Sequence, residues 1–175
     1  MPVYIVLFRG VGGATQLPVA PLREALAAAG FENVATYINS GNAVVKSHLP
    51  ATKIVSTIAG ICSSAFGFEK AIYALTLAEW DRIIANCPFQ PAEGKFLHAA
   101  WLERDPDPGK IEALSGLCMN GDQFLVIDKV AYIHTPRGFS KSKLAERFDK
   151  WIGVPNTARN WNTVLKLREL AVRAQ

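Results

Sequence analysis

The stretch TYINSGNAVVK, residues 36–46, decides how the first half of this 175-residue chain folds. Apolar and β-branched residues flank the corner Asn39-Ser40-Gly41-Asn42, and this pattern predicts a β-hairpin. Glycine adopts positive φ freely, and asparagine and serine side chains bond the nearby backbone, so these residue types suit a turn. The elements before and after the hairpin can pack on the two strands that it creates.

The residues around the hairpin predict an alpha-beta plait. Residues 3–8 form a continuous apolar run, which is typical of a central strand covered on both faces. Glycine and proline positions then divide the first half into further elements, namely a helix ended by Gly30, strands at residues 31–38 and 42–46, a helix between Pro50 and Gly67, and a strand at residues 71–75. The order βαββαβ predicts a ferredoxin-like plait over residues 1–75, with the first strand beside the third.

The second half, residues 76–175, reads as another α+β unit with a helical C-terminus. Thr76 and Glu79 form a capping box at the start of its first helix. The further elements expected are strands at residues 96–102, 122–127 and 130–135, a helix from Ser140 to about residue 152, a break at residues 153–156, and a final helix opened by residues 159–163. The sequence therefore predicts an α+β fold of two closely packed ferredoxin-like halves without a flexible linker.

Composition limits the class of protein. Hydrophobic residues make up 50% of the chain and charged residues 19%, which is enough apolar material for a substantial core. The net charge of +4 permits an anionic partner but is mild for a dedicated DNA-binding protein. The three cysteines have neither metal-binding nor redox spacing, and no segment reads as a signal peptide or a membrane span. We expect a cytoplasmic protein with no metal, no cofactor and no membrane partner; the oligomeric state stays open.

The glycine-rich loop after the first strand is the first candidate site. Its residues Arg9, Gly10, Gly12 and Gly13 offer backbone N–H groups and one cation to a phosphate. The spacing matches neither a dinucleotide-binding fingerprint nor a P-loop, so a simple tight connection is the alternative.

Two basic or amide-rich stretches in the second half are the other candidates. The lysines Lys141 and Lys143 lie at the start of a predicted helix, where cations oppose the helix dipole unless an anion is bound. The alternative is that Ser140 is an ordinary N-cap with solvated lysines around it. The guanidinium of Arg159 can bind an anion through two hydrogen bonds, and the amides of Asn160 and Asn162 can hydrogen-bond a ligand. The alternative is that these residues only begin the last helix. The hairpin residues Asn39, Ser40 and Asn42 are candidates for the same ligand site, which we expect in a cleft between the two halves.

Catalysis has little support in the sequence. None of the three histidines, His48, His98 and His134, has metal-ligand spacing, and no nucleophile motif is present, so no catalytic residue is assigned. His134 ends a strand before a basic loop and is the one histidine to test as an acid or base.

Three stretches together resemble the bacterial family catalogued as domain of unknown function 1697. They are residues 4–10, residues 36–44 and residues 158–164, and residues 86–89 and 140–144 match similar runs of that family. The resemblance implies a fold of paired plait halves and no known activity. The chain departs from the family pattern at the glycine loop, which is shorter here and lacks an asparagine.

Three functional hypotheses follow from these residues. The first is a module that binds a phosphate-bearing or other anionic small molecule between its two halves. The second is nucleic-acid binding through the basic last third, although the aromatic RNP pattern is missing. The third is a small-molecule enzyme of unknown reaction that uses His134.

Overall fold

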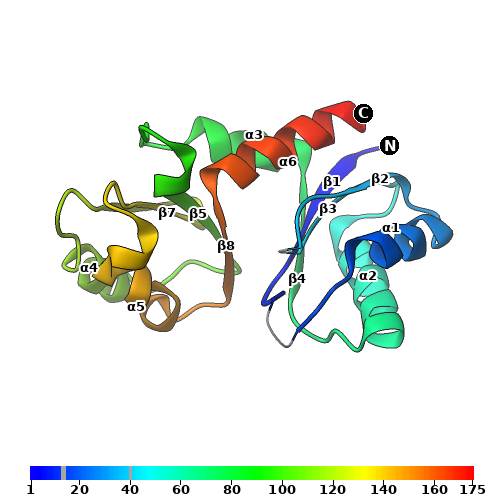
Figure 1. Cartoon of the computed structure of the whole chain (residues 1–175), viewed down its shortest axis with the longest axis horizontal. Helices are drawn as coiled ribbons and strands as arrows, with labels where there is room; N and C mark the ends of the chain where they lie inside the picture. Colours follow the sequence, from blue (N-terminus) through cyan, green and yellow to red (C-terminus); the bar gives the residue numbers. More distant parts are fainter. Residues whose placement is uncertain (13–14, 40) are drawn as a thin grey trace. The chain divides into compact units, whose positions relative to one another are not determined.

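The computed structural model describes residues 1–12, 15–39 and 41–175 (Figure 1). Gly13 and Ser40, two of the predicted site residues, therefore lie outside the described residues. The described chain contains six α-helices and two four-stranded antiparallel sheets, so the predicted α+β class is confirmed. It forms two compact units, Met1–Arg82 with Lys166–Gln175, and Ile83–Leu165, and each is considered by itself. The boundary expected between residues 75 and 76 lies just before α3 (Leu77–Ala85), whereas the first segment ends at Arg82, within that helix.

The first unit contains the predicted plait. Its elements are β1 (Val3–Phe8), α1 (Val19–Ala28), β2 (Glu32–Thr36), β3 (Asn42–Lys46), α2 (Ala51–Phe66) and β4 (Ile72–Thr76). The strand order is β2-β3-β1-β4, and β1 pairs with both β3 and β4, as the crossover argument predicts. Ile5 lies opposite Val44 on one side and opposite Leu75 on the other.

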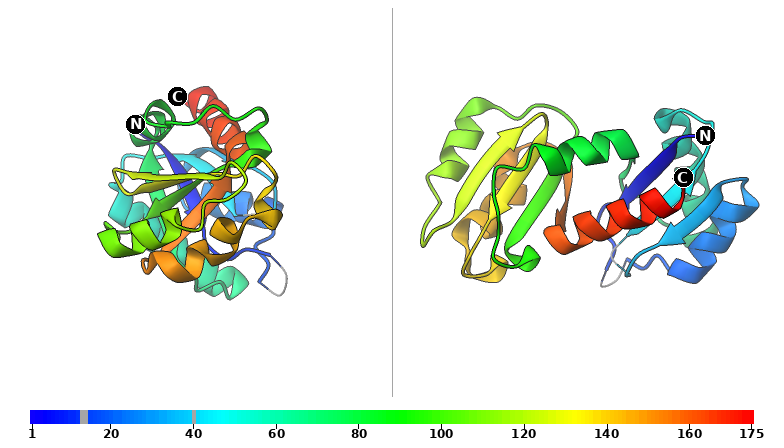
Figure 2. Two further views of the ribbon diagram at one scale, coloured as in Figure 1. Left: turned by 90° about the vertical axis from the view of Figure 1, so that its left-hand side faces the viewer. Right: turned by 90° about the horizontal axis from the view of Figure 1, so that it is seen from above.

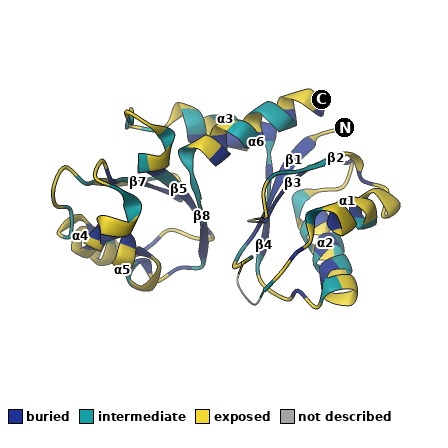
Figure 3. Ribbon diagram, in the orientation of Figure 1, coloured by how far each residue is buried: buried dark blue, intermediate teal, exposed yellow. Residues whose placement is uncertain are grey.

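The core of the first unit is built on β1. All six residues of this strand are buried, which confirms that it is central and covered on both faces (Figure 3). Tyr4, Val6 and Phe8 belong to one hydrophobic cluster with buried residues of both plait helices, among them Leu22, Leu26, Ile54, Ile58 and Cys62. The helices α1 and α2 therefore lie on the same face of the sheet (Figure 2).

The last turns of α6 (Trp161–Arg173) belong to the first unit and make polar contacts with its other elements. Asn33 Nδ2 donates to the Ala174 carbonyl at 2.9 Å, and Lys46 Nζ bonds the Gln175 carbonyl. Arg168 pairs with Asp81 of α3 (Leu77–Ala85) at 2.6 Å. The predicted capping box at the start of α3 is confirmed, because Glu79 accepts from the Thr76 backbone N–H at 2.7 Å.

The second unit is also a plait. Its elements are β5 (Leu97–Leu102), α4 (Pro108–Ser115), β6 (Gln123–Ile127), β7 (Val130–His134), α5 (Lys143–Ile152) and β8 (Asn156–Asn160), with short 3-10 turns η1 (Gly94–Phe96) and η2 (Phe139–Lys141). The strand order β6-β7-β5-β8 repeats that of the first sheet. Buried residues of α4 and α5, including Leu114, Leu144 and Phe148, pack with Ala100 and Leu102 of β5.

Two expected element boundaries in the second unit are wrong. Residues 156–160 form the edge strand β8 instead of a chain break and a helix start, and α6 begins only at Trp161. The helix expected from Ser140 begins at Lys143, because Ser142 is its N-cap and accepts from the Ala145 N–H at 3.2 Å. Among the described residues, no helix combines the length and the apolar character that crossing a bilayer requires.

Candidate functional site

The glycine loop and the hairpin corner meet at one edge of the first sheet. The Phe8 N–H, at the end of β1, donates to the Gly41 carbonyl at 2.9 Å. A Cβ on Gly41 would lie 2.8 Å from the Phe8 carbonyl oxygen and 2.8 Å from Val11 Cγ2. Two predicted candidate segments that are thirty residues apart in sequence are therefore in direct contact, which sequence reasoning alone did not establish.

Asn42 holds the hairpin corner closed. Its side chain is buried, and Nδ2 donates to the Tyr37 carbonyl at 3.1 Å, while the Tyr37 N–H donates to the Asn42 carbonyl at 3.2 Å. Asn39 is exposed at the same corner. Of these two asparagines, Asn39 is the one that a ligand can reach without opening the corner.

Two cations accompany the glycine loop. Arg9 is half-buried, and its backbone N–H donates to the Ala71 carbonyl at 2.9 Å, so it lies beside the start of β4. The exposed Lys70 extends over Gly10, where a Cβ would lie 2.9 Å from Lys70 Cδ and 3.2 Å from Nζ. Sequence reasoning missed Lys70. A signal was present, because a residue just before a strand antiparallel to β1 must lie near the end of β1.

A third cation lies at the same edge of the sheet. Arg23, on α1, donates from Nη1 to Thr36 Oγ1 at 2.9 Å, and Thr36 is the last residue of β2. Because β2 runs antiparallel to β3 and therefore parallel to β1, its end shares an edge with the end of β1. Arg9, Lys70 and Arg23 thus place three cations along this edge.

The loop backbone adds hydrogen-bond donors. Gly12 and Thr15 exchange two backbone hydrogen bonds, of 2.7 and 3.0 Å, which close a tight turn. Within the part of the chain that the structure describes, the N–H groups of Gly10 and Val11 have no acceptor. Consecutive free N–H groups beside positive-φ glycines form a concave donor surface for an anion, and Gly10 has φ +69° and Gly12 φ +135°.

The second unit does not bring Arg159 and Asn160 together. Both lie in β8, where successive side chains point to opposite faces of the sheet. Arg159 lies opposite Ala99, and Nη1 donates to Thr157 Oγ1 at 2.6 Å and to the Ala158 carbonyl at 2.8 Å. Burial lowers the pKa of Arg159 to about 10, so the guanidinium stays charged at neutral pH.

The remaining candidates of the second unit have structural surroundings. Asn160 Oδ1 accepts from the Thr163 N–H at 3.0 Å and so caps α6. Asn162 is exposed and lies against Gly94, where an added Cβ would collide with its Oδ1. Lys141 and Lys143 are both exposed on either side of the N-cap Ser142.

Asn160→Ala should lower the free energy of unfolding by about 1 kcal/mol, because the first turn of α6 loses its N-cap. Asn160→Asp, which keeps a capping oxygen, should stay within a few tenths of a kcal/mol of the wild type. Urea unfolding followed by circular dichroism measures both. Equal losses in the two variants would refute the capping role and favour the predicted role of the amide as a ligand reader.

The histidines of the second unit are held by aromatic neighbours. His134 Nδ1 lies 2.9 Å from Gln123 Oε1, and its ring stacks on Phe89 with centroids 5.8 Å apart. Burial lowers the pKa of His134, and the charge of Asp122 partly opposes that effect. His98 packs on Phe139 with centroids 4.0 Å apart, and its Nδ1 is buried without a hydrogen-bond partner among the described residues. The described residues contain no cluster of three or more potential metal ligands.

The fold and this edge define the protein as a two-plait α+β protein with a cationic glycine loop in its first plait. The chain belongs to the family described as protein of unknown function (DUF1697), whose profile matches residues 1–132, and this confirms the predicted resemblance. A solved structure of the conserved bacterial protein SP0830 from Streptococcus pneumoniae shares the fold, with a TM-score of 0.71 and 19% identity over 97% of this chain and 98% of that one. A comparison with curated proteins gives no match.

Proposed function

We propose that the protein is a cytosolic module that binds a small phosphate-bearing anion at the glycine-loop edge of its first unit. The observation that carries the proposal is the position of Lys70 over Gly10, next to Arg9 and the free N–H groups of Gly10 and Val11. Two cations supply charge, and the backbone supplies directed donors that cost no side-chain ordering.

The net charges of the two units do not separate this edge from the basic last third, because part of that last third belongs to the first unit. The first unit has nine lysines and arginines against six aspartates and glutamates, a net charge of +3, and the second has ten against nine, a net charge of +1. Residues 166–175, with three lysines and arginines against one glutamate, contribute +2 of the +3 of the first unit and belong to the basic last third, so it is the ion pairing of α6 that disfavours nucleic-acid binding there.

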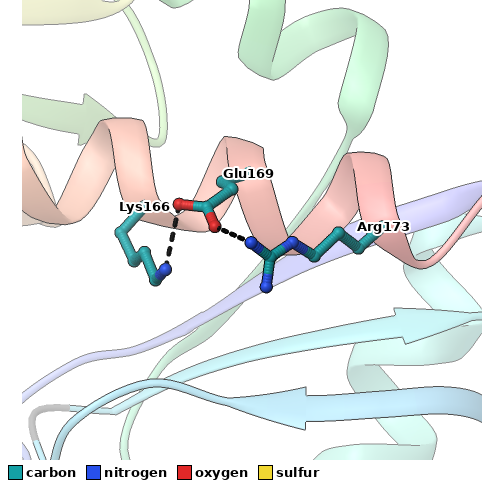
Figure 4. A network of polar contacts seen from close by, with 3 residues as sticks. All are labelled: Lys166, Glu169 and Arg173. Carbon is teal, nitrogen blue, oxygen red and sulfur yellow. Dashed lines mark hydrogen bonds and ion pairs between the residues drawn. The ribbon is translucent and has the colours of Figure 1, made fainter.

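Part of the basic last third is neutralised by ion pairs on α6. Glu169 accepts from Lys166 at 2.9 Å and pairs with Arg173, as Figure 4 shows. The hydrogen bond from Lys166 lowers the pKa of Glu169, and the charge of Arg173 acts in the same direction. Arg168 is paired with Asp81. These cations are less available to a polyanion than a count of basic residues implies.

Lys70→Gln should weaken the binding of inorganic phosphate about tenfold, because one charge-assisted contact is lost. Isothermal titration at low and moderate salt measures the affinity, with Lys53→Gln as the matched control. Lys53 is exposed on α2, which begins after the end of β3 and therefore at the opposite edge of the sheet. Its replacement should leave the affinity within about twofold of the wild type.

Two results would contradict the proposal. One is the absence of phosphate binding by the wild-type protein at low salt. The other is an equal effect of Lys70→Gln and Lys53→Gln, which would reduce the site to general attraction by net charge. Short oligonucleotides belong in the same titration: binding that disappears with salt and ignores Lys70→Gln would favour nucleic-acid binding instead.

A further inference from the structure

Ile38, in the hairpin loop, combines an exposed apolar side chain with an unfavourable backbone conformation. The residue is 49% exposed, and its φ is +48°. A β-branched residue at positive φ is a true outlier, because its Cβ branches collide with the backbone there. Neither core packing nor local conformation explains an isoleucine at this position.

The other residues with positive φ are of types that suit it or belong to a turn that requires it. Among the described non-glycine residues, these are Asn33, Asn120, Asp128 and Lys129. Asparagine and aspartate accept the left-handed region with little cost, and Asp128 and Lys129 form the two-residue turn between β6 and β7. Ile38 is the exception, and such an outlier points to a function that maintains it.

Ile38 belongs to the loop that contacts the glycine loop. The loop is closed by the hydrogen bond between Tyr37 and Asn42, and its Gly41 touches Phe8 and Val11. The exposed Ile38 therefore lies on the same hairpin corner that forms one side of the proposed anion site. An apolar surface next to cations and free N–H groups matches a ligand that has a charged end and an apolar end.

We infer that Ile38 is a specificity residue of this site and that the ligand is a phosphate monoester with an apolar group next to the phosphate. The inference rests on the proposed function, since the phosphate must occupy the glycine loop. Binding covers the Ile38 side chain and removes apolar surface from water on both sides of the contact. The energetic cost of the left-handed isoleucine is then offset only in the complex.

The test compares inorganic phosphate, methyl phosphate, phenyl phosphate and hexyl phosphate by isothermal titration. The wild-type protein should bind phenyl or hexyl phosphate about tenfold more tightly than methyl phosphate, because those esters cover Ile38. A preference for the phenyl ester indicates a planar group such as a nucleobase, and a preference for the hexyl ester indicates an alkyl chain.

Ile38→Asn and Ile38→Gly are the decisive variants, because both residues accept positive φ. Each should reduce the preference for the apolar ester to about twofold or less, leave methyl phosphate affinity unchanged, and melt at or above the wild-type Tm. Met119→Asn is the matched control, since Met119 is 57% exposed in the second unit, and it should keep the full preference.

The failures of the two proposals are distinguishable. If methyl and inorganic phosphate bind but the apolar esters bind no better, the inference about Ile38 is wrong and the anion site stands. A lower Tm in both Ile38 variants with an unchanged ester preference would assign Ile38 a structural role and overturn the inference. If no phosphate compound binds, both proposals fail.

Discussion

Gly41→Ala should lower the free energy of unfolding by roughly 2–4 kcal/mol, as measured by urea denaturation. Two physical effects add at this position. The backbone has φ +78°, which costs a side chain about 1–2 kcal/mol, and the new Cβ would lie 2.8 Å from the Phe8 carbonyl oxygen. A backbone atom at the end of the central strand cannot move aside as a flexible side chain can.

Gly67→Ala is the matched control for this prediction. Gly67 ends α2 with a similar φ of +63°, but no atom of the described residues lies within 4 Å of its Cβ position. Its replacement should cost only about 1 kcal/mol, the conformational part of the effect. Equal losses at the two glycines would show that the close contact between the hairpin corner and β1 contributes nothing.

The same substitution also tests the candidate site. At Gly41 there is no room for a Cβ between the hairpin corner and the residues Phe8 and Val11. A methyl group there should therefore displace the glycine loop. Phosphate affinity should therefore fall in Gly41→Ala and persist in Gly67→Ala. That result would show that the glycine loop and the hairpin corner act as one structural feature.

The first plait was predictable because its signals are local. The continuous apolar run of β1, the turn residues of the hairpin and the terminal glycines each depend on neighbours in the sequence. The edge strand β8 was not predictable in this way, because Asn156–Asn160 reads Asn-Thr-Ala-Arg-Asn and has low strand propensity. Pairing with β5, a tertiary interaction, makes it a strand.

The candidate site was predicted in part for the same reason. Arg9 and its glycines were identified from one stretch, whereas Lys70 and Arg23 join them only through the pairing of β4 and β2 in the sheet. Arg159 and Asn160 were assigned to one site because they are adjacent in sequence. In a strand, adjacent side chains point to opposite faces of the sheet, so these two residues cannot line a site on one face.

Acidification from pH 7 to pH 4 should lower the free energy of unfolding through His98 by about 3 kcal/mol. Burial lowers the pKa of His98 from its ordinary 6.5 to about 4. Below pH 6.5 the unfolded chain binds a proton that the folded protein does not, so stability falls as the pH decreases toward 4. Well above pH 6.5 both states have a neutral imidazole, and His98 contributes no pH dependence there.

The comparison of His98→Gln with His48→Gln isolates this contribution. The side chain of His98 packs on Phe139, and its buried Nδ1 has no partner among the described residues, so no contact there favours the charged ring. The wild-type protein and His48→Gln, which changes an exposed histidine, should lose stability more steeply between pH 6.5 and 4 than His98→Gln. Urea denaturation across this range measures the slopes. Parallel slopes in all three proteins would show that the folded second plait tolerates a protonated His98. Water would then reach its ring despite the packing of Phe139.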